Sequence, residues 1–223
     1  MRDQAPHRPP RGFAAGEPPE PTVLPVAVAV VVPVKSFELA KGRLARHLDA
    51  DHRGRLARQL AARVLEAAGD LERWVACDSD EVARWARNQG AGVLRHPEPG
   101  LNPAVAHAVA ELGRRGTDRV IVAHGDLPLA QDITWVGDFD GVTIVPDRRG
   151  DGTNVLAVPT GAGFVFAYGA GSASRHRAEA ERLGLPLRVV ADEALGWDID
   201  TPDDLALFDS LGRPGVTPAE QTP

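Results

Sequence analysis

The sequence predicts an α/β protein, a three-layer α/β/α sandwich of Rossmann-like type built on a mostly parallel sheet. Short apolar segments rich in β-branched residues alternate along the chain with amphipathic segments of helical length. This alternation is typical of βαβ units. The first apolar segment, Val26 to Val32, is uninterrupted, as expected of a strand that is buried on both faces of a parallel sheet.

The chain length and the proline distribution predict one folded domain between two disordered ends. A chain of 223 residues suits a single core. Residues 1–25 carry seven prolines, mixed charges and few aliphatic side chains, a composition typical of disorder. Residues 212–223 have the same character. The folded domain is therefore expected to span residues 26–211.

Composition excludes several classes of function. The net charge of -6 argues against a surface that binds nucleic acid, which needs an excess of Lys and Arg. The longest apolar run is too short to cross a bilayer, and no signal pattern opens the chain, so a cytoplasmic location is expected. Cys77 is the single cysteine, which rules out an internal disulfide and a Cys-cluster metal site.

The remaining elements follow in order after the first strand. Apolar residues at helical spacing around Leu56 to Leu65 predict a helix, and Pro103 is placed to open another, since proline suits the first helical position. The two close strands after Val142 predict an antiparallel addition near the sheet edge. The full set of expected elements is strands at 26–32, 73–77, 93–94, 119–123, 142–145, 154–158 and 187–190, with helices around 56–65 and at 80–89, 103–112, 172–183 and 201–211.

Two acidic features follow predicted strands, where open α/β sheets bind their ligands. Asp126 comes soon after strand 119–123, and taken alone it is best interpreted as a turn or capping residue. Asp198 and Asp200 alternate in an extended segment, so they share a face, where like charges repel unless a cation lies between them. Capping of the following helix accounts for Thr201 and the acidic residues after it, but not for this pair.

A rival acidic pair, Asp78 and Asp80, follows strand 73–77. Here helix capping by Ser79 or Asp80 is the favoured interpretation. The pair therefore ranks below Asp198 and Asp200 as a candidate metal site.

Candidate anion-binding groups lie in the loop after the first strand and before helix 172–183. Lys35, Lys41 and Arg43 could reach bound phosphates at the carboxyl edge of the sheet, although no P-loop pattern is present. The Gly-rich turn from Gly169 to Ser172 leads into a helix N-terminus, which favours an anion. Ser172 could equally be the helix cap, and His176 is either a ligand contact or a packed histidine.

In order and spacing, these segments together resemble one family. They are Pro33-Val34-Lys35, Ala40-Lys41-Gly42-Arg43-Leu44, Gly100-Leu101-Asn102, Gly125-Asp126-Leu127-Pro128-Leu129, Pro146-Asp147, Gly152-Thr153-Asn154, Phe166 to Ser172 with His176, and Asp198-Ile199-Asp200-Thr201-Pro202. The chain resembles the guanylyltransferases that activate 2-phospho-L-lactate or phosphoenolpyruvate with GTP in coenzyme F420 biosynthesis.

The resemblance implies a nucleotide-diphospho-sugar transferase fold and a guanylyltransferase domain over residues 26–211. It implies Mg²⁺ as the cofactor, GTP and a phosphorylated three-carbon acid as the substrates, and pyrophosphate as one product. The residues that it points to are metal ligands (Asp126, Asp198, Asp200), contacts to the acid (Thr153, Gly169, Ser172), nucleotide contacts (Lys35, Lys41, Arg43, Asn102) and catalytic groups (Lys35, Arg43, Asp126).

Alternatives stay open at this point. The same scaffold carries sugar-phosphate and molybdenum-cofactor nucleotidyltransferases and glycosyltransferases, and a non-catalytic nucleotide-binding domain is a further reading. The Arg- and Ala-rich composition favours phosphoenolpyruvate over 2-phospho-L-lactate only as a hint. Homodimer formation and coupling to the next enzyme of the pathway are also left open. Gly42 and Ala170 stand where the family commonly has Ser and Pro, and His124-Gly125 stands where apolar and small residues usually precede the Asp.

Overall fold

The computed structural model describes residues 26–38, 40–96 and 98–210. The two ends predicted to be disordered, residues 1–25 and 212–223, lie outside the described residues. The strands are β1 (Val28–Pro33), β2 (Glu72–Cys77), β3 (Gly92–Arg95), β4 (Arg119–Ala123), β5 (Val142–Pro146), β6 (Thr153–Pro159) and β7 (Leu187–Val189). The helices are α1 (Ala50–Glu66), α2 (Asp80–Asn88), α3 (Leu101–Arg114), α4 (Ser172–Arg182) and α5 (Pro202–Ser210), with short 3-10 helices η1 (Gly42–Leu44), η2 (Thr134–Gly137) and η3 (Thr160–Ala162).

The seven strands form one sheet in the order β3-β2-β1-β4-β6-β5-β7. Neighbouring strands are parallel except at β6, which runs antiparallel to both β4 and β5. The expected antiparallel pair near the sheet edge is confirmed: only β7 separates β5 and β6 from that edge, and β6 also pairs with β4. The reversed direction of β6 brings its first residue, Thr153, to the carboxyl ends of the other strands.

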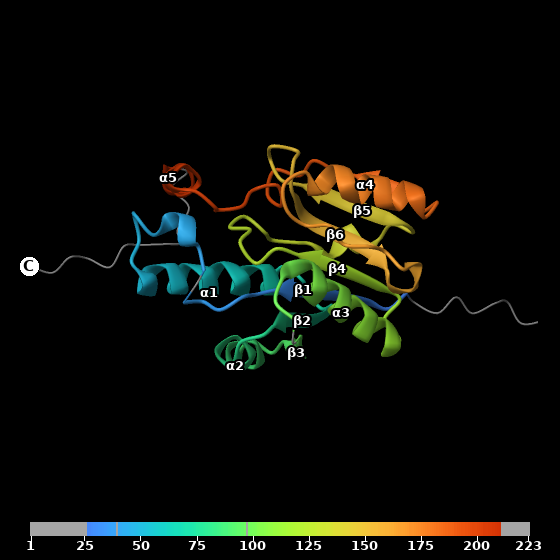
Figure 1. Cartoon of the computed structure of the whole chain (residues 1–223), viewed down its shortest axis with the longest axis horizontal. Helices are drawn as coiled ribbons and strands as arrows, with labels where there is room; N and C mark the ends of the chain where they lie inside the picture. Colours follow the sequence, from blue (N-terminus) through green and yellow to red (C-terminus); the bar gives the residue numbers. More distant parts are fainter. Residues whose placement is uncertain (1–25, 39, 97, 211–223) are drawn as a thin grey trace, which may run out of the picture.

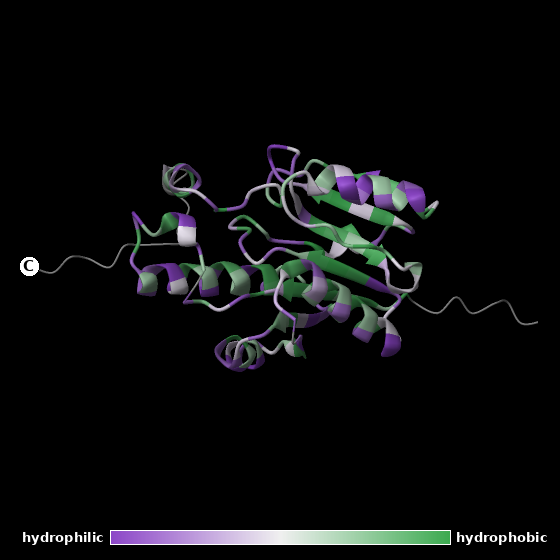
Figure 2. Ribbon diagram, viewed as in Figure 1, coloured by the Kyte–Doolittle hydropathy of each residue, from purple (hydrophilic) through white to green (hydrophobic). Residues whose placement is uncertain are grey.

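Apolar residues cover both faces of the sheet, which confirms the three-layer sandwich. In β1, Val30 and Val32 pack with the buried residues of α1 and α2, whereas Ala29 and Val31 pack with α3 and α4. Figure 1 shows the strands between the helices, and Figure 2 shows that hydrophobic residues concentrate on the strands while the outer surfaces of the helices are hydrophilic. None of the described helices is both long and apolar enough to span a bilayer.

The helix start predicted at Pro103 is shifted by two residues. α3 begins at Leu101 after Gly100, which has φ 123°, so Pro103 lies third in the helix rather than first. A proline is tolerated there because the first N–H groups of a helix have no intrahelical partner. The start predicted for α4 is confirmed at Ser172, and the N-cap position belongs to Gly171 with φ 71°, so Ser172 is not the helix cap.

A third apolar cluster lies beyond the end of the sheet. Phe208 of α5 packs with Leu44 of η1 and with Leu56 and Leu60 of α1. Ile199, which is fully buried, belongs to the same cluster. In Figure 1, α5 lies near η1 and the first turns of α1. This cluster anchors the acidic segment 198–200 against the loops that follow β1 and β4.

Candidate active site

The ammonium group of Lys41 lies between two of the predicted metal aspartates. Its Nζ donates to Asp126 Oδ2 at 2.7 Å and to the carbonyl oxygen of Ile199 at 2.5 Å, and it lies 3.4 Å from Asp200 Oδ1. Only 9% of the Lys41 side chain is exposed. The structure therefore brings Lys41, Asp126 and Asp200 together from three distant parts of the chain.

Local backbone structure holds these groups in place. Lys41 is the only described non-glycine residue with positive φ, at 53°, which turns its side chain from the start of η1 toward the sheet edge. Asp126 follows β4 and accepts a backbone bond at its carbonyl from the Ile199 N–H at 3.3 Å. Because Ile199 is buried, Asp200 beside it is fixed against the Asp126 loop.

Opposite charges perturb the ionisation of this cluster. Burial alone would lower the pKa of Lys41, but Asp126 and Asp200 outweigh it and raise the Lys41 pKa above its usual value. Burial alone would likewise raise the pKa of Asp126, and Lys41 lowers it below the usual range. Lys41 is therefore charged and Asp126 is ionised at neutral pH.

Asp198 is in the opposite situation. Among the described residues its carboxylate has no hydrogen-bond or ion-pair partner, while Asp126 and Asp200 lie near it. Burial, followed by the repulsion from Asp126 and Asp200, raises the pKa of Asp198 to about 6. Such a carboxyl group is costly for the fold, which is characteristic of a functional site.

The capping interpretation of the neighbouring residues is confirmed. The Asp204 N–H donates to Thr201 Oγ1 at 3.3 Å, and the Asp204 carboxylate accepts from the Thr201 and Asp200 N–H groups at 2.8 and 3.1 Å. Arg148 also forms an ion pair with Asp204. These partners account for Asp204 and leave Asp198 and Asp200 facing the site, as the sequence predicts.

The two other predicted phosphate-binding cations lie at the surface of the same edge. Arg43 Nη1 is 3.3 Å from Asp200 Oδ2, and 74% of its side chain is exposed. Lys35 follows β1 and is exposed, and it lines the cavity that also contains Lys41 and Asp126. Both cations are free to move toward a bound phosphate at little cost, because exposed ion pairs contribute little stability.

Thr153 is held by His176, which is a packed histidine rather than an exposed ligand contact. The Ala167 N–H donates to His176 Nε2 at 3.0 Å, and His176 Nδ1 lies 3.0 Å from Thr153 Oγ1. Burial lowers the pKa of His176 to about 4, so the ring is neutral. Because Nε2 accepts, Nδ1 must carry the proton and donate to Thr153. The Thr153 hydroxyl proton is then directed away from His176.

The predicted anion-binding site at Gly169 to Ser172 is partly occupied by groups of the protein itself. Asp151 Oδ2 accepts from the Gly171 N–H at 2.9 Å, and the Asp151 carbonyl accepts from the Ala173 N–H at 3.0 Å. The Ser172 N–H is bound to the Gly169 carbonyl at 3.0 Å. A carboxylate of the protein thus already lies at this helix N-terminus, a contact that sequence spacing does not reveal.

Asn102 binds the protein backbone rather than facing open space. Its Oδ1 accepts from the Tyr168 N–H at 2.7 Å, and its Nδ2 donates to the Tyr168 carbonyl at 3.4 Å. Both ends of the amide are engaged, so the geometry assigns Asn102 to positioning the turn before α4. This differs from the predicted contact with guanine or ribose.

The carboxylates suit a hard cation, but they do not form a complete cage. Among the described residues no group of three or more His, Cys, Asp or Glu side chains is arranged to hold a metal ion. Asp126 Oδ1, however, is buried and has no hydrogen-bond partner in the described part of the chain, and Asp198 and Asp200 supply further oxygens nearby. Mg²⁺ is commonly held by one or two carboxylates together with substrate phosphates. The donor set fits that mode of binding.

We predict that Asp198→Asn stabilises the protein at neutral pH. The raised pKa means that the folded protein binds this proton more tightly than the unfolded chain, so ionisation of Asp198 lowers stability as the pH rises from about 4 through 6. The variant should gain about 1 to 2 kcal/mol at pH 7.5 and little at pH 4 in urea unfolding, because solvent screens part of the effect at this partly exposed carboxyl group. Asp203→Asn, at an exposed position nearby, is the matched control. A loss of stability in Asp198→Asn at pH 7.5 would refute the assignment.

A double-mutant cycle tests the Thr153–His176 hydrogen bond. His176→Phe and Thr153→Val each leave a buried polar partner unpaired and should each destabilise the fold by about 1 to 3 kcal/mol. The double variant should be more stable than the sum of the two effects predicts, because both ends of the bond are then removed. Additive free energies of unfolding would show that the two side chains are not coupled.

Comparisons with known proteins identify the family of this chain. The model of the family described as "Guanylyl transferase CofC like" matches residues 28–209. Phosphoenolpyruvate guanylyltransferase of Sphaerobacter thermophilus is 36% identical over 78% of this chain and 89% of its own length. The protein of the same name from Conexibacter woesei is 37% identical over 78% of this chain and 84% of its own.

Solved structures confirm the fold. A nucleotide-diphospho-sugar transferase structure from Desulfovibrio desulfuricans G20 matches with a TM-score of 0.68 at 18% identity, covering 84% of this chain and 88% of that one. A nucleotidyl transferase from Methanothermobacter matches with a TM-score of 0.58 at 17% identity, covering 83% and 97%. With the family match over most of its length, this chain belongs to the CofC-like guanylyl transferase family.

Proposed function

We propose that this protein transfers the guanylyl group of GTP to phosphoenolpyruvate. The products are enolpyruvoyl-2-diphospho-5'-guanosine and pyrophosphate, and the reaction belongs to coenzyme F420 biosynthesis. Family membership supports guanylyl transfer, and the names of the two relatives support phosphoenolpyruvate as the acceptor. 2-Phospho-L-lactate carries the same charged groups and is the alternative acceptor.

The observation that carries the proposal is the cluster of Lys41, Asp126 and Asp200 at the carboxyl edge of the sheet. Two phosphate-bearing substrates repel each other, so an enzyme of this kind must supply cations where they meet. Lys41 is held at that place, and Lys35 lines the same cavity. Lys35 and Arg43 would then neutralise the charge of the departing pyrophosphate.

The acceptor needs a hydrogen-bond donor rather than a base. The phosphate of phosphoenolpyruvate is ionised at neutral pH, so its oxygen attacks the α-phosphorus of GTP without losing a proton. That new P–O bond forms as the bond from the α-phosphorus to the oxygen of the leaving pyrophosphate breaks. The fixed tautomer of His176 makes Thr153 a donor toward the anionic acceptor. This polarity suits the acceptor carboxylate.

The carboxylates of the site are the reason for including Mg²⁺ in the proposal. Asp126, Asp198 and Asp200 would hold the ion, which would offset the phosphate charges and align the displacement when bound. Lys41 makes a free Mg²⁺ compete with an ammonium group for Asp126. The carboxylates of this chain would therefore take the ion together with the nucleotide phosphates.

Product analysis tests the proposed function. We expect GTP, Mg²⁺ and phosphoenolpyruvate to yield pyrophosphate and a product with the mass of the guanosine diphosphate ester. Asp126→Asn should lower turnover by about a thousandfold or more, since it would remove a carboxylate that holds the Mg²⁺ offsetting the phosphate charges. Asp70→Asn serves as the control, because Asp70 is exposed, is remote from the cluster in sequence and forms no ion pair with any described residue.

Three outcomes would contradict the proposal. One is the absence of a guanylylated product with either three-carbon acid. Another is transfer to sugar phosphates under the same conditions. The last is a turnover of Asp126→Asn close to that of Asp70→Asn, which would remove Asp126 from the chemistry.

A further inference from the structure

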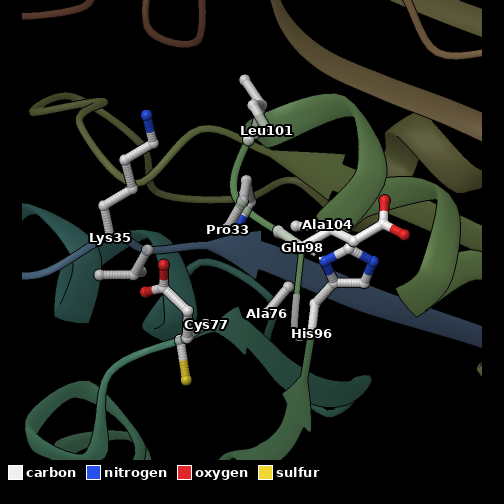
Figure 3. A pocket seen from close by; sticks show the side chains of 11 residues that line it. Pro33, Lys35, Ala76, Cys77, His96, Glu98, Leu101 and Ala104 are labelled. Carbon is white, nitrogen blue, oxygen red and sulfur yellow. Dashed lines mark hydrogen bonds between the residues drawn. The ribbon is translucent and has the colours of Figure 1, made fainter.

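A second hollow adjoins the cavity that contains Lys41 and Asp126. It lies at the carboxyl ends of β1, β2 and β3 and is closed on one side by the first turn of α3. Figure 3 shows Lys35 at one end of this hollow and His96 with Glu98 at the other, with Pro33 and Ala76 between them. Lys35 lines both hollows, so a ligand in the second could extend past Lys35 to the acidic cluster.

The walls of this hollow are largely apolar, and two of the backbone groups that line it are already hydrogen-bonded within the protein. Pro33, Val34, Leu101 and Ala104 supply apolar surface. The Val34 N–H is bound to the Ala76 carbonyl at 2.9 Å, and the Cys77 carbonyl accepts from the His96 N–H at 3.4 Å. Apolar walls suit the faces of a flat heterocycle. Side chains that line the hollow, among them Asp78 and Glu98, can then recognise its polar edge.

Asp78 is the side chain best placed for that recognition. Of the acidic pair that the sequence ranks as a helix cap, Asp80 is bound to Arg95 at 2.7 Å, and Ser79 caps α2 by accepting from the Val82 N–H at 3.5 Å. Asp78 lines the hollow and has no hydrogen-bond or ion-pair partner among the described residues. Capping thus accounts for its neighbours but leaves Asp78 unexplained.

Asp78 is also more firmly placed than the other carboxylate of the hollow. It directly follows the buried end of β2, where Ala76 pairs with Pro33 of β1. Its short side chain has few rotamers. Glu98 lies in the loop after β3 on a longer side chain, and both Asp78 and Glu98 are exposed.

A carboxylate distinguishes guanine from adenine by its hydrogen-bonding pattern. Guanine presents two adjacent donors, N1–H and the N2 amino group, which a carboxylate accepts together. Adenine presents a lone pair at N1, which a carboxylate repels. We propose that Asp78 binds the N1–H and N2 amino groups of a guanine base in this hollow and so selects GTP. This inference rests on the proposed use of a nucleoside triphosphate and assigns the residue that chooses the base.

A change in the hydrogen-bonding groups at position 78 tests the assignment. Asp78→Asn replaces one carboxylate oxygen by an NH₂ donor, which matches the carbonyl at C2 of xanthine. We expect kcat/KM for GTP to fall about 10- to 100-fold and the ratio of xanthosine triphosphate to GTP use to rise by at least as much, with the KM for phosphoenolpyruvate unchanged. Preference for GTP over inosine triphosphate, which lacks the N2 amino group, should also shrink.

Glu98→Gln is the matched control, since it makes the same chemical change at the other carboxylate of the hollow. We expect it to keep the base preference of the unmodified protein. Unchanged preference for GTP over xanthosine and inosine triphosphates in Asp78→Asn would overturn the inference, as would a switch produced by Glu98→Gln instead.

Calorimetric titration of the full chain with each nucleotide, without an acceptor, separates this inference from the proposed function. Asp78→Asn should weaken GTP binding and favour xanthosine triphosphate even if no transfer occurs. Activity in the unmodified protein with unaltered base preference in Asp78→Asn would reject the role of Asp78 alone. Thermal unfolding of both variants checks that each is folded. We expect this because Asp78 and Glu98 are both exposed.

Discussion

The position of the Lys41 ammonium group is the constraint on which the site depends. It joins the loop after β1, the loop after β4 and the segment before α5. Lys41 is separated in sequence by 85 residues from Asp126 and by 159 residues from Asp200. Without a cation there, Asp126 and Asp200 would face each other and the unpartnered Asp198 across a partly buried space. The cluster of Leu44, Ile199 and Phe208 holds the segments together from behind. Packing and charge thus fix the same geometry.

The site carries more negative charge than the fold requires. Lys41 offsets Asp126 and Asp200, whereas Asp198 keeps a pKa raised to about 6. A carboxylate that weakens the fold at neutral pH is accounted for if it serves a ligand. On the other side of the same edge, His176 turns Thr153 into a donor. Carboxylates and a hydroxyl donor therefore lie along one edge, an arrangement that suits the proposed joining of two phosphorylated substrates.

The alternation of apolar and amphipathic segments was enough to predict the layered fold, because both faces of the sheet must be covered. The pattern could not place β6 between β4 and β5, since pairing partners depend on contacts remote in sequence. Residue types single out Asp198 and Asp200 once capping by Thr201 and Asp204 is set aside, and the structure brings both near Asp126. Spacing could not show that Lys41 lies between the aspartates, that Asn102 holds Tyr168 or that Asp151 fills the start of α4. Each of these contacts exists only after the chain has folded.

Calorimetric titration with Mg²⁺, with and without a non-hydrolysable GTP analogue, tests the central claim most directly. Lys41 occupies the space between Asp126 and Asp200, and the described residues form no complete metal cage. The account predicts weak Mg²⁺ binding by the free protein, tighter binding once the nucleotide phosphates are present, and stronger binding by free Lys41→Met than by the unmodified chain. Tight binding of Mg²⁺ by the free, unmodified protein, unchanged by the nucleotide or by Lys41→Met, would contradict it.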